Sequence, residues 1–206
     1  MRIVDLSHVI FPGMFKFPGD YHPAVEFEVT GVYDRDRCLV HRVIMGTHSG
    51  THIDAPRHFF EGYRSIDEVL LDMLITEVYV VDLTGVMEIT REAFAKYEEE
   101  LKKVGGVLLR TGWWRYWGTS KFYSDFPLMT ADAARWLVER GLKTIAVDFP
   151  LPVEVHEVVL GSDGVLVENL TNLDRLPVGV IKLIALPLKL KGLDAAPARV
   201  VALVED

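Results

Sequence analysis

The alternation of hydrophobic and polar positions first predicts a run of short strands. Residues 2–10 and 25–30 alternate between apolar and polar side chains, and residues 37–45 are rich in β-branched and apolar ones. A period of two is typical of a strand with one buried face. Residues 11–20 are dense in proline and glycine, so we expect a loop between the first two strands. The start of the chain is therefore predicted to be β-structure that leads into a loop-like stretch near residue 48.

The rest of the chain alternates between helix and strand patterns. Ser65 and Glu68 have capping-box spacing, and apolar residues at helical intervals extend that helix to about Leu74. Three more helical segments are predicted at residues 91–103, between 130 and 141, and at 156–160. Strands are predicted at residues 77–83, 107–109, 143–149, 165–167, 180–190 and 199–204. This order predicts an α/β fold, a single mixed-sheet domain over residues 1–206 with helices outside.

Composition and charge narrow the class of partner. Half of the 206 residues are apolar and 25% are charged, an ordinary profile for a globular domain. The formal net charge of −8 makes nucleic acid or an anionic membrane surface a poor partner. Cys38 is the single cysteine, and its apolar neighbours predict a buried position in a reducing compartment. Polar Asp5 and His8 interrupt any signal-peptide core, and no apolar run spans a membrane, so we expect a cytoplasmic protein.

Histidines cluster in one short stretch. Three of the seven histidines lie within residues 48–58, where simple proportion predicts roughly 0.4 in a window of that length. They are His48, His52 and His58, and Asp54 lies among them. Imidazole and carboxylate groups together suit zinc or a similar divalent ion. The stretch therefore predicts a metal site.

The backbone of this stretch is predicted to be extended and bent, not helical. Gly50 is a weak helix former, and Pro56 would remove a helical hydrogen bond. In an extended chain His52 and Asp54, which are two residues apart, project to the same face. Gly50 can let the chain bend so that His48 folds back towards that face.

Residues 48–59, His-Ser-Gly-Thr-His-Ile-Asp-Ala-Pro-Arg-His-Phe, resemble the H-x-G-T-H-x-D-x-P-x-H-F signature of the cyclase family of metal-dependent hydrolases, which includes kynurenine formamidase. The resemblance extends to residues 5–7, 17–20, 156, 168–170 and 192–197. It implies a swivelling β/β/α domain that assembles into a homodimer or homotetramer. It also implies two divalent metal ions, with zinc favoured and manganese as the alternative.

The resemblance implies a role for particular residues. The implied metal ligands, in chain order, are His48, His52, Asp54, His156 and Glu168. The first three would hold one ion and the last three the other, with Asp54 as the bridge. His58 would be the catalytic acid and base. Phe17 would contact the substrate, because it takes the place of a tryptophan that lies against the substrate in kynurenine formamidases.

These residue types predict hydrolysis of an amide or ester-like bond, with metal-activated water attacking the carbonyl, and the resemblance implies a small amide of the arylformamidase kind as the substrate. A metal lowers the pKa of bound water from 15.7 to about 7. His58, with an ordinary pKa of about 6.5, can take a proton from water and deliver it to the leaving nitrogen. Two alternatives stay open: hydrolysis of a cyclic amide or lactone, as isatin hydrolases perform, and metal-dependent binding of a small ligand without catalysis.

Two further stretches bear on the substrate and on assembly. Residues 149–152, Phe-Pro-Leu-Pro, stand where a more polar loop is expected in kynurenine formamidases, so the predicted pocket is more apolar. Residues 113–123 contain three tryptophans, two tyrosines and a phenylalanine. They form either a substrate lid or a buried contact between subunits, and we favour the contact.

Overall fold

The computed structural model describes residues 1–205, and its main sheet closes on itself. The strands of this sheet are β1 (Arg2–Asp5), β4 (His52–Asp54), β5 (Ile75–Asp82), β7 (Gly106–Arg110), β9 (Thr144–Val147), β10 (Val165–Glu168), β11 (Gly179–Pro187) and β12 (Ala195–Val204). They pair in the order β1-β12-β11-β5-β7-β9-β10-β4, and β4 also pairs with β12. Within the described residues, seven strands therefore form a closed barrel, and β1 is added along the C-terminal half of β12.

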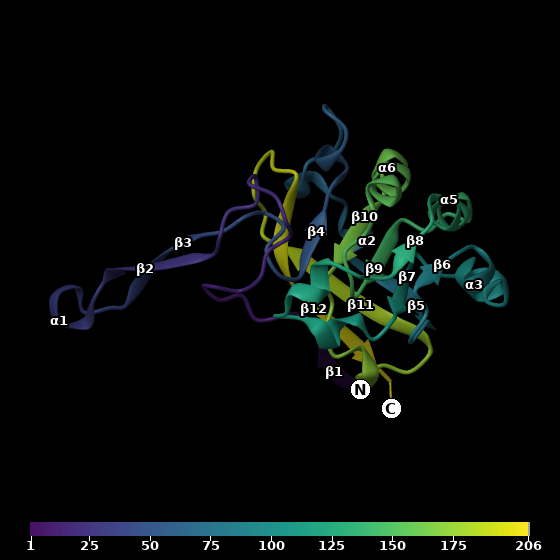
Figure 1. Cartoon of the computed structure of the whole chain (residues 1–206), viewed down its shortest axis with the longest axis horizontal. Coiled ribbons are helices and arrows are strands. Elements are labelled where there is room, and N and C mark those ends of the chain that lie inside the picture. The colour runs from purple at the N-terminus through teal and green to yellow at the C-terminus, as the bar shows by residue number, and fades with distance from the viewer. Residues whose placement is uncertain (206) are drawn as a thin grey trace.

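Helices cover the outside of the barrel along its parallel strands β5, β7, β9 and β10 (Figure 1). The α-helices of the body are α2 (Leu71–Leu74), α3 (Glu92–Ala95), α4 (Glu98–Leu101), α5 (Ala131–Glu139) and α6 (Val153–Gly161). Thr130 caps α5, since its side chain accepts a hydrogen bond from the backbone N–H of Ala133. The connections also contain the short strands β6 (Glu88–Ile89) and β8 (Leu128–Met129). The predicted mixed α/β class, with helices on the outside, is confirmed.

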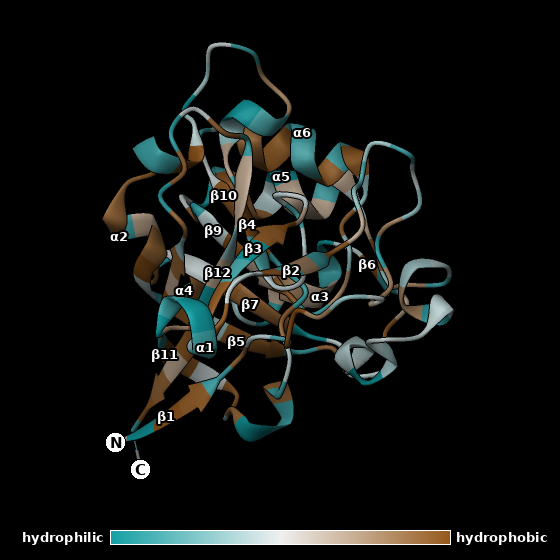
Figure 2. Ribbon diagram, turned by 90° about the vertical axis from the view of Figure 1, so that its left-hand side faces the viewer, coloured by the Kyte–Doolittle hydropathy of each residue, from teal (hydrophilic) through white to brown (hydrophobic). Residues whose placement is uncertain are grey.

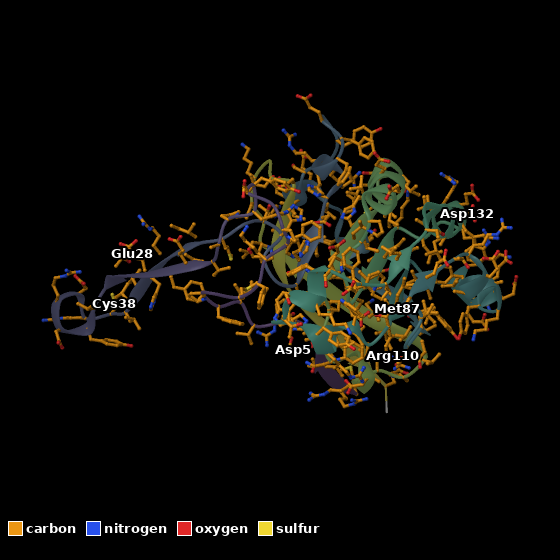
Figure 3. The ribbon with its side chains drawn as sticks, in the orientation of Figure 1. Asp5, Glu28, Cys38, Met87, Arg110 and Asp132 are labelled. Atoms are coloured by element: carbon orange, nitrogen blue, oxygen red, sulfur yellow. The ribbon has the colours of Figure 1, made fainter. Side chains whose placement is uncertain are left out.

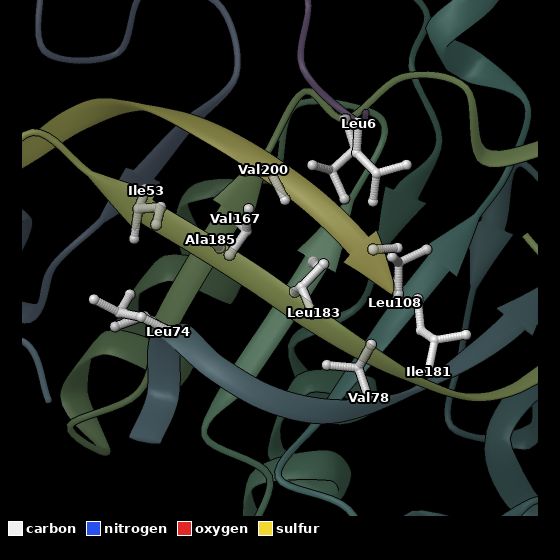
Figure 4. Packing of buried hydrophobic residues seen from close by; sticks show 14 of the residues in the cluster. Leu6, Ile53, Leu74, Val78, Leu108, Val167, Ile181, Leu183, Ala185 and Val200 are labelled. Carbon is white, nitrogen blue, oxygen red and sulfur yellow. The ribbon is translucent and has the colours of Figure 1, made fainter. Parts of the chain in front are cut away.

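Two hydrophobic clusters stabilise this arrangement. One fills the barrel and takes residues from all of its strands, among them Ile53, Val78, Leu108, Val167 and Val200 (Figure 4). The other lies between the parallel strands and the helices, and includes the fully buried Phe94, Phe122 and Phe149. The parallel strands are thus buried on both faces, which explains their continuous apolar sequence. In Figure 2 the strands of the body are largely hydrophobic, whereas α1 (Tyr33–Asp36) is hydrophilic.

A hairpin arm projects from the body (Figure 1). It consists of β2 (Glu26–Gly31) and β3 (Val40–Ile44), which pair with each other in a separate two-stranded sheet and are joined through α1. Every residue of β3 is exposed. Cys38 lies near the tip of this arm and is also exposed (Figure 3), so its predicted burial is wrong. Apolar neighbours predicted a strand correctly, but they did not show that the strand leaves the core.

Some predicted helices break into shorter pieces. The capping box of Ser65 and Glu68 forms, but it opens only the 3-10 turn η2 (Ile66–Glu68), because Val69 and Leu70 adopt extended backbone before α2. The helix predicted at 91–103 is divided into α3 and α4. Conversely, the turn predicted at 156–160 is the longer α6. The prediction of one domain over residues 1–206 stays a prediction. No helix in residues 1–205 is long and apolar enough to cross a membrane.

Candidate metal and active site

The short strand β4 places two site residues in the wall of the barrel. His52 and Asp54 are both buried, and His52 Nε2 lies 3.3 Å from Asp54 Oδ1. The antiparallel register of β4 and β10 sets Glu168 opposite His52, with His52 Nε2 3.8 Å from Glu168 Oε2. Residues two apart in a strand share a face, so the expected convergence of His52 and Asp54 agrees with the structure.

Gly50 brings His48 back to this face. Its φ of 70° is the left-handed conformation that glycine adopts at no steric cost, and an added Cβ would lie 2.8 Å from Ile10 Cγ1. After this bend His48 Nδ1 lies 2.8 Å from Asp54 Oδ1. The predicted bend at Gly50 therefore has the expected consequence for His48.

Helix α6 contributes the most distant member of the cluster. His156 lies on its buried face, with Nε2 3.4 Å from Asp54 Oδ2 and 3.3 Å from Glu168 Oε1. The structure thus brings all five predicted ligands together in two groups that share Asp54: His48, His52 and Asp54, and Asp54, His156 and Glu168. Within each group the candidate ligand atoms lie within 4.8 Å of one another. Their role as ligands stays a prediction.

Backbone carbonyls fix which nitrogen of two imidazoles faces the centre. The Nδ1 atoms of His52 and His156 lie 2.9 Å from the carbonyl oxygens of Gly50 and Pro152. A carbonyl oxygen only accepts, so each Nδ1 donates its proton there. When these imidazoles are neutral, each Nε2 therefore presents a lone pair to the carboxylates, the arrangement that metal-binding histidines use.

Asp54 is fully buried, yet within the part of the chain that the structure describes its two oxygens accept no hydrogen bond of good geometry. Three imidazole nitrogens lie within 3.4 Å of these oxygens without being aligned to donate to them. A buried carboxylate without partners is costly, and a cation between these groups would remove that cost. Nitrogen and oxygen donors of this kind suit zinc or manganese. The residues present therefore fit a divalent metal centre.

The electrostatics of the cluster also favour cations. Burial alone would raise the pKa of Asp54, but the neighbouring His52 and His48 hold it well below its usual range. Burial would lower the pKa of His48, but Asp54 and Asp194 outweigh it and raise the pKa to about 10. Asp54 and Glu168 likewise raise the pKa of His156 against the effect of burial. A metal ion would take the place of the protons that these imidazoles otherwise hold.

His58 lies beside the cluster and is oriented by Asp194, a residue that the sequence analysis did not single out. His58 ends the 3-10 turn η1 (Pro56–His58), and its Nδ1 lies 3.2 Å from Asp194 Oδ2. The same oxygen lies 2.9 Å from His48 Nε2. Burial raises the pKa of Asp194, but its hydrogen bonds with His48 and His58 outweigh this and lower it. Its position within residues 192–197, a segment of the family resemblance, was the available signal.

A cavity of about 210 Å³ opens next to the cluster. Phe17, the predicted substrate contact, lines it together with His22, which was not predicted, and Tyr123, which belongs to the segment for which a substrate lid was one alternative. The imidazoles of His22 and His48 stand edge to face, with ring centroids 6.1 Å apart. Burial, followed by the charges of nearby groups including His48, lowers the pKa of His22.

The aromatic segment 113–123 is largely core. Trp113, Trp114 and Phe122 are buried by the chain itself, so for these side chains both predicted alternatives, lid and subunit contact, are wrong. The 3-10 turns η3 (Trp113–Tyr116) and η4 (Ser120–Tyr123) position them. Tyr123, at the end of the segment, is the member that reaches the cavity.

Comparison with known proteins shows the family to which this fold and sequence are similar. A sequence profile described as putative cyclase matches residues 4–152. The chain is 34% identical to the kynurenine formamidase of Erythrobacter litoralis (strain HTCC2594), over 97% of this chain and 93% of that protein. It is 29% identical to the kynurenine formamidase of Bacillus thuringiensis subsp. konkukian (strain 97-27), over 96% and 95%. An isatin hydrolase bound to the product analogue thioisatinate superposes with a TM-score of 0.88, 26% identity and coverage of 99% and 92%.

Proposed function

The chain belongs to the putative cyclase family, and from this premise we propose that it is a metal-dependent hydrolase of small amides. One observation carries the proposal: Asp54, fully buried and without a hydrogen-bond partner among residues 1–205, lies among three imidazoles and Glu168 beside a cavity. The similarity to kynurenine formamidases favours an aryl formamide such as N-formylkynurenine as substrate. The similarity to an isatin hydrolase supports a cyclic amide or lactone as the second candidate.

We propose that two divalent ions bind, with zinc favoured and manganese as the alternative. His48, His52 and Asp54 would hold one ion, and Asp54, His156 and Glu168 the other. When bound, such ions make water more acidic and polarise a carbonyl group. The carbonyls of Gly50 and Pro152 hold the imidazoles of His52 and His156 ready for this role.

His58 would move the proton in the reaction. Asp194 accepts a hydrogen bond from His58 Nδ1, which leaves Nε2 of that ring as the atom that exchanges protons. Nε2 would take a proton from the attacking water and donate it to the leaving nitrogen. Phe17, Phe59 and Tyr123 would lie against the substrate and exclude bulk water.

A substrate panel tests this function. Metal-free protein and protein reloaded with zinc or manganese should be assayed on N-formylkynurenine, isatin and an aryl lactone. We expect hydrolysis of at least one of these substrates, and only after metal is restored. Tightly bound metal without turnover of any of them would instead support a binding protein without catalysis.

We propose that the arm takes part in a homodimer or homotetramer. Phe27, Val29 and Val43 on its two strands are 45%, 51% and 51% exposed. Two-stranded hairpins are marginally stable alone in water, and burial of these apolar groups against another copy would stabilise the arm.

The double variant Val29→Asp/Val43→Asp is expected to shift the assembly towards monomers, because two charges would enter the proposed interface. Light scattering coupled to size exclusion measures the mass directly. Leu128→Asp is the matched control, since Leu128 is 54% exposed on β8 of the body. A monomeric wild type, or an unchanged mass in the double variant, would contradict the proposed role of the arm.

A further inference from the structure

We propose that the cavity selects uncharged, single-ring aryl amides and gives no binding site to a charged amino-acid group on the substrate. This inference rests on the proposed function, because it names the substrate class of the same site. It predicts that the aminocarboxylate of N-formylkynurenine contributes nothing to recognition, although the chain resembles kynurenine formamidases.

The cavity has two chemically different sides. One side is the ionisable cluster with His58, in which the imidazoles of His58 and His156 already face the carboxylates of Asp194 and Glu168. The other side is mostly apolar or aromatic and includes Phe17, Phe59, Tyr123, Pro150, Leu151 and Val153, while Tyr21, His22 and Asn169 are the polar residues that complete the lining. Within residues 1–205, no lysine or arginine lines this cavity. A substrate carboxylate would therefore meet no permanent cation on the recognition side.

The apolar side is built into the fold. Pro150 and Leu151 follow β9, and Leu151 is only 6% exposed. The backbone N–H of Leu151 donates to Glu168 Oε1 at 3.0 Å, which fixes this loop beside the cluster and leaves its N–H unable to serve a substrate carboxylate. Pro150 and Leu151 of the Phe-Pro-Leu-Pro sequence thus put hydrocarbon on the wall of the cavity.

Lys16 is the basic side chain that competes with this interpretation. It lines a small neighbouring hollow together with Phe17 and His22. Its Nζ donates to the carbonyl oxygen of Gly19 at 2.9 Å, within its own exposed loop. We infer that Lys16 holds the loop that carries Phe17 and, because it does not line the main cavity, does not receive a substrate carboxylate.

The volume of the cavity and the cost of removing water from a charged group also favour small, uncharged aryl amides. Sites for drug-sized ligands usually enclose about 300–1,000 Å³, and the cavity here is about 210 Å³. A benzene ring with one amide fits such a space. A zwitterionic side chain would have to leave water beside the buried Pro150 and Leu151 without a partner, and unpaired charge is costly to bury.

A matched pair of substrates tests the inference on the metal-loaded, full-length protein. N-formylkynurenine and 2'-formamidoacetophenone share the ring, ketone and formamide, and only the former carries the amino-acid group. We expect kcat/KM to be about 10-fold higher for the neutral compound, equivalent to about 1.4 kcal/mol. A higher kcat/KM for N-formylkynurenine would overturn the inference and leave the proposed hydrolase function intact.

Product binding gives a readout that does not depend on turnover. By titration calorimetry, 2'-aminoacetophenone is expected to bind more tightly than kynurenine. If neither formamide is hydrolysed, the proposed aryl formamidase function is wrong. The relative affinities of the two ketones still test whether the cavity prefers the uncharged compound. Tighter binding of kynurenine, or no binding of either ketone, would overturn it.

Variants of the cavity wall complete the test. Val153 is 57% exposed at the start of α6, so Val153→Lys adds a cation at the mouth of the cavity. It should raise kcat/KM for N-formylkynurenine relative to the neutral compound by about 2- to 5-fold, as a partly exposed ion pair would. Val153→Leu keeps the wall apolar and should keep the preference. A fall in the relative kcat/KM for N-formylkynurenine in Lys16→Met would show that Lys16 binds the carboxylate and would overturn the inference.

Discussion

A His58→Ala variant is expected to keep its metal content and to lose about 10²- to 10⁴-fold in kcat, the usual contribution of a positioned acid and base. His58 contacts Asp194 and lies outside the two groups that share Asp54. Removing its imidazole should therefore stop proton transfer without emptying the metal centre. Elemental analysis of the purified variant and steady-state kinetics on its best substrate measure the two effects separately.

Arg57→Ala is the matched control for this variant, because Arg57 lies on the same 3-10 turn and is exposed. It should retain kcat within a few-fold. If His58→Ala lost metal and activity together, His58 would be acting as a ligand, through the third group of candidate ligand atoms that it forms with His48 and Asp194. Full activity in His58→Ala would remove it from the mechanism.

Asp54→Asn is expected to have the largest effect on metal binding, because Asp54 belongs to both ligand groups. Asparagine keeps one neutral amide oxygen but loses the second oxygen and the negative charge, so it cannot serve both ligand groups as a carboxylate does. Mutation of residues that only hydrogen-bond to metal ligands typically lowers metal affinity by about 10- to 100-fold. Loss of a ligand shared by both groups should therefore lower metal affinity by more than about 100-fold and abolish measurable turnover. Metal stoichiometry after dialysis measures this directly.

Glu168→Gln distinguishes loss of the bridging ligand Asp54 from nonspecific disruption of the metal site. Glu168 belongs to only one of the two groups, so this variant should lose one ion while Asp54→Asn loses both. Thermal unfolding of the metal-free proteins checks that both variants are folded. Equal metal content in Asp54→Asn and wild type would contradict the proposed site.

Local sequence predicted one half of the cluster well. The period of two in an extended chain places His52 beside Asp54, and Gly50 permits the bend that returns His48. His156 and Glu168 are more than 100 residues further along the chain and were predicted only through the family resemblance. Asp194 precedes β12 and reaches His58 because its backbone oxygen accepts from Ala55 N–H, a tertiary contact without a local pattern.

The mixed α/β class of the fold was predicted from the sequence, but the closure of its sheet into a barrel was not. Closure of the barrel depends on β4 pairing with β12, about 140 residues away, and a strand of three residues gives no periodicity to detect. The arm was not distinguished from the core, because residues 25–30 alternate as a half-buried strand does and residues 37–45 are rich in β-branched and apolar side chains. The helix predicted at 91–103 breaks at Tyr97, whose φ of −111° and ψ of 11° are not helical.

The central claim is that metal held around Asp54 makes this protein an amide hydrolase. The most direct test is to add zinc stepwise to chelator-treated wild-type protein and to follow the hydrolysis of an aryl formamide together with bound metal. We predict no turnover without metal, and activity that rises with bound zinc and levels off at about two ions per chain. Hydrolysis at the same rate in the metal-free protein would contradict the account.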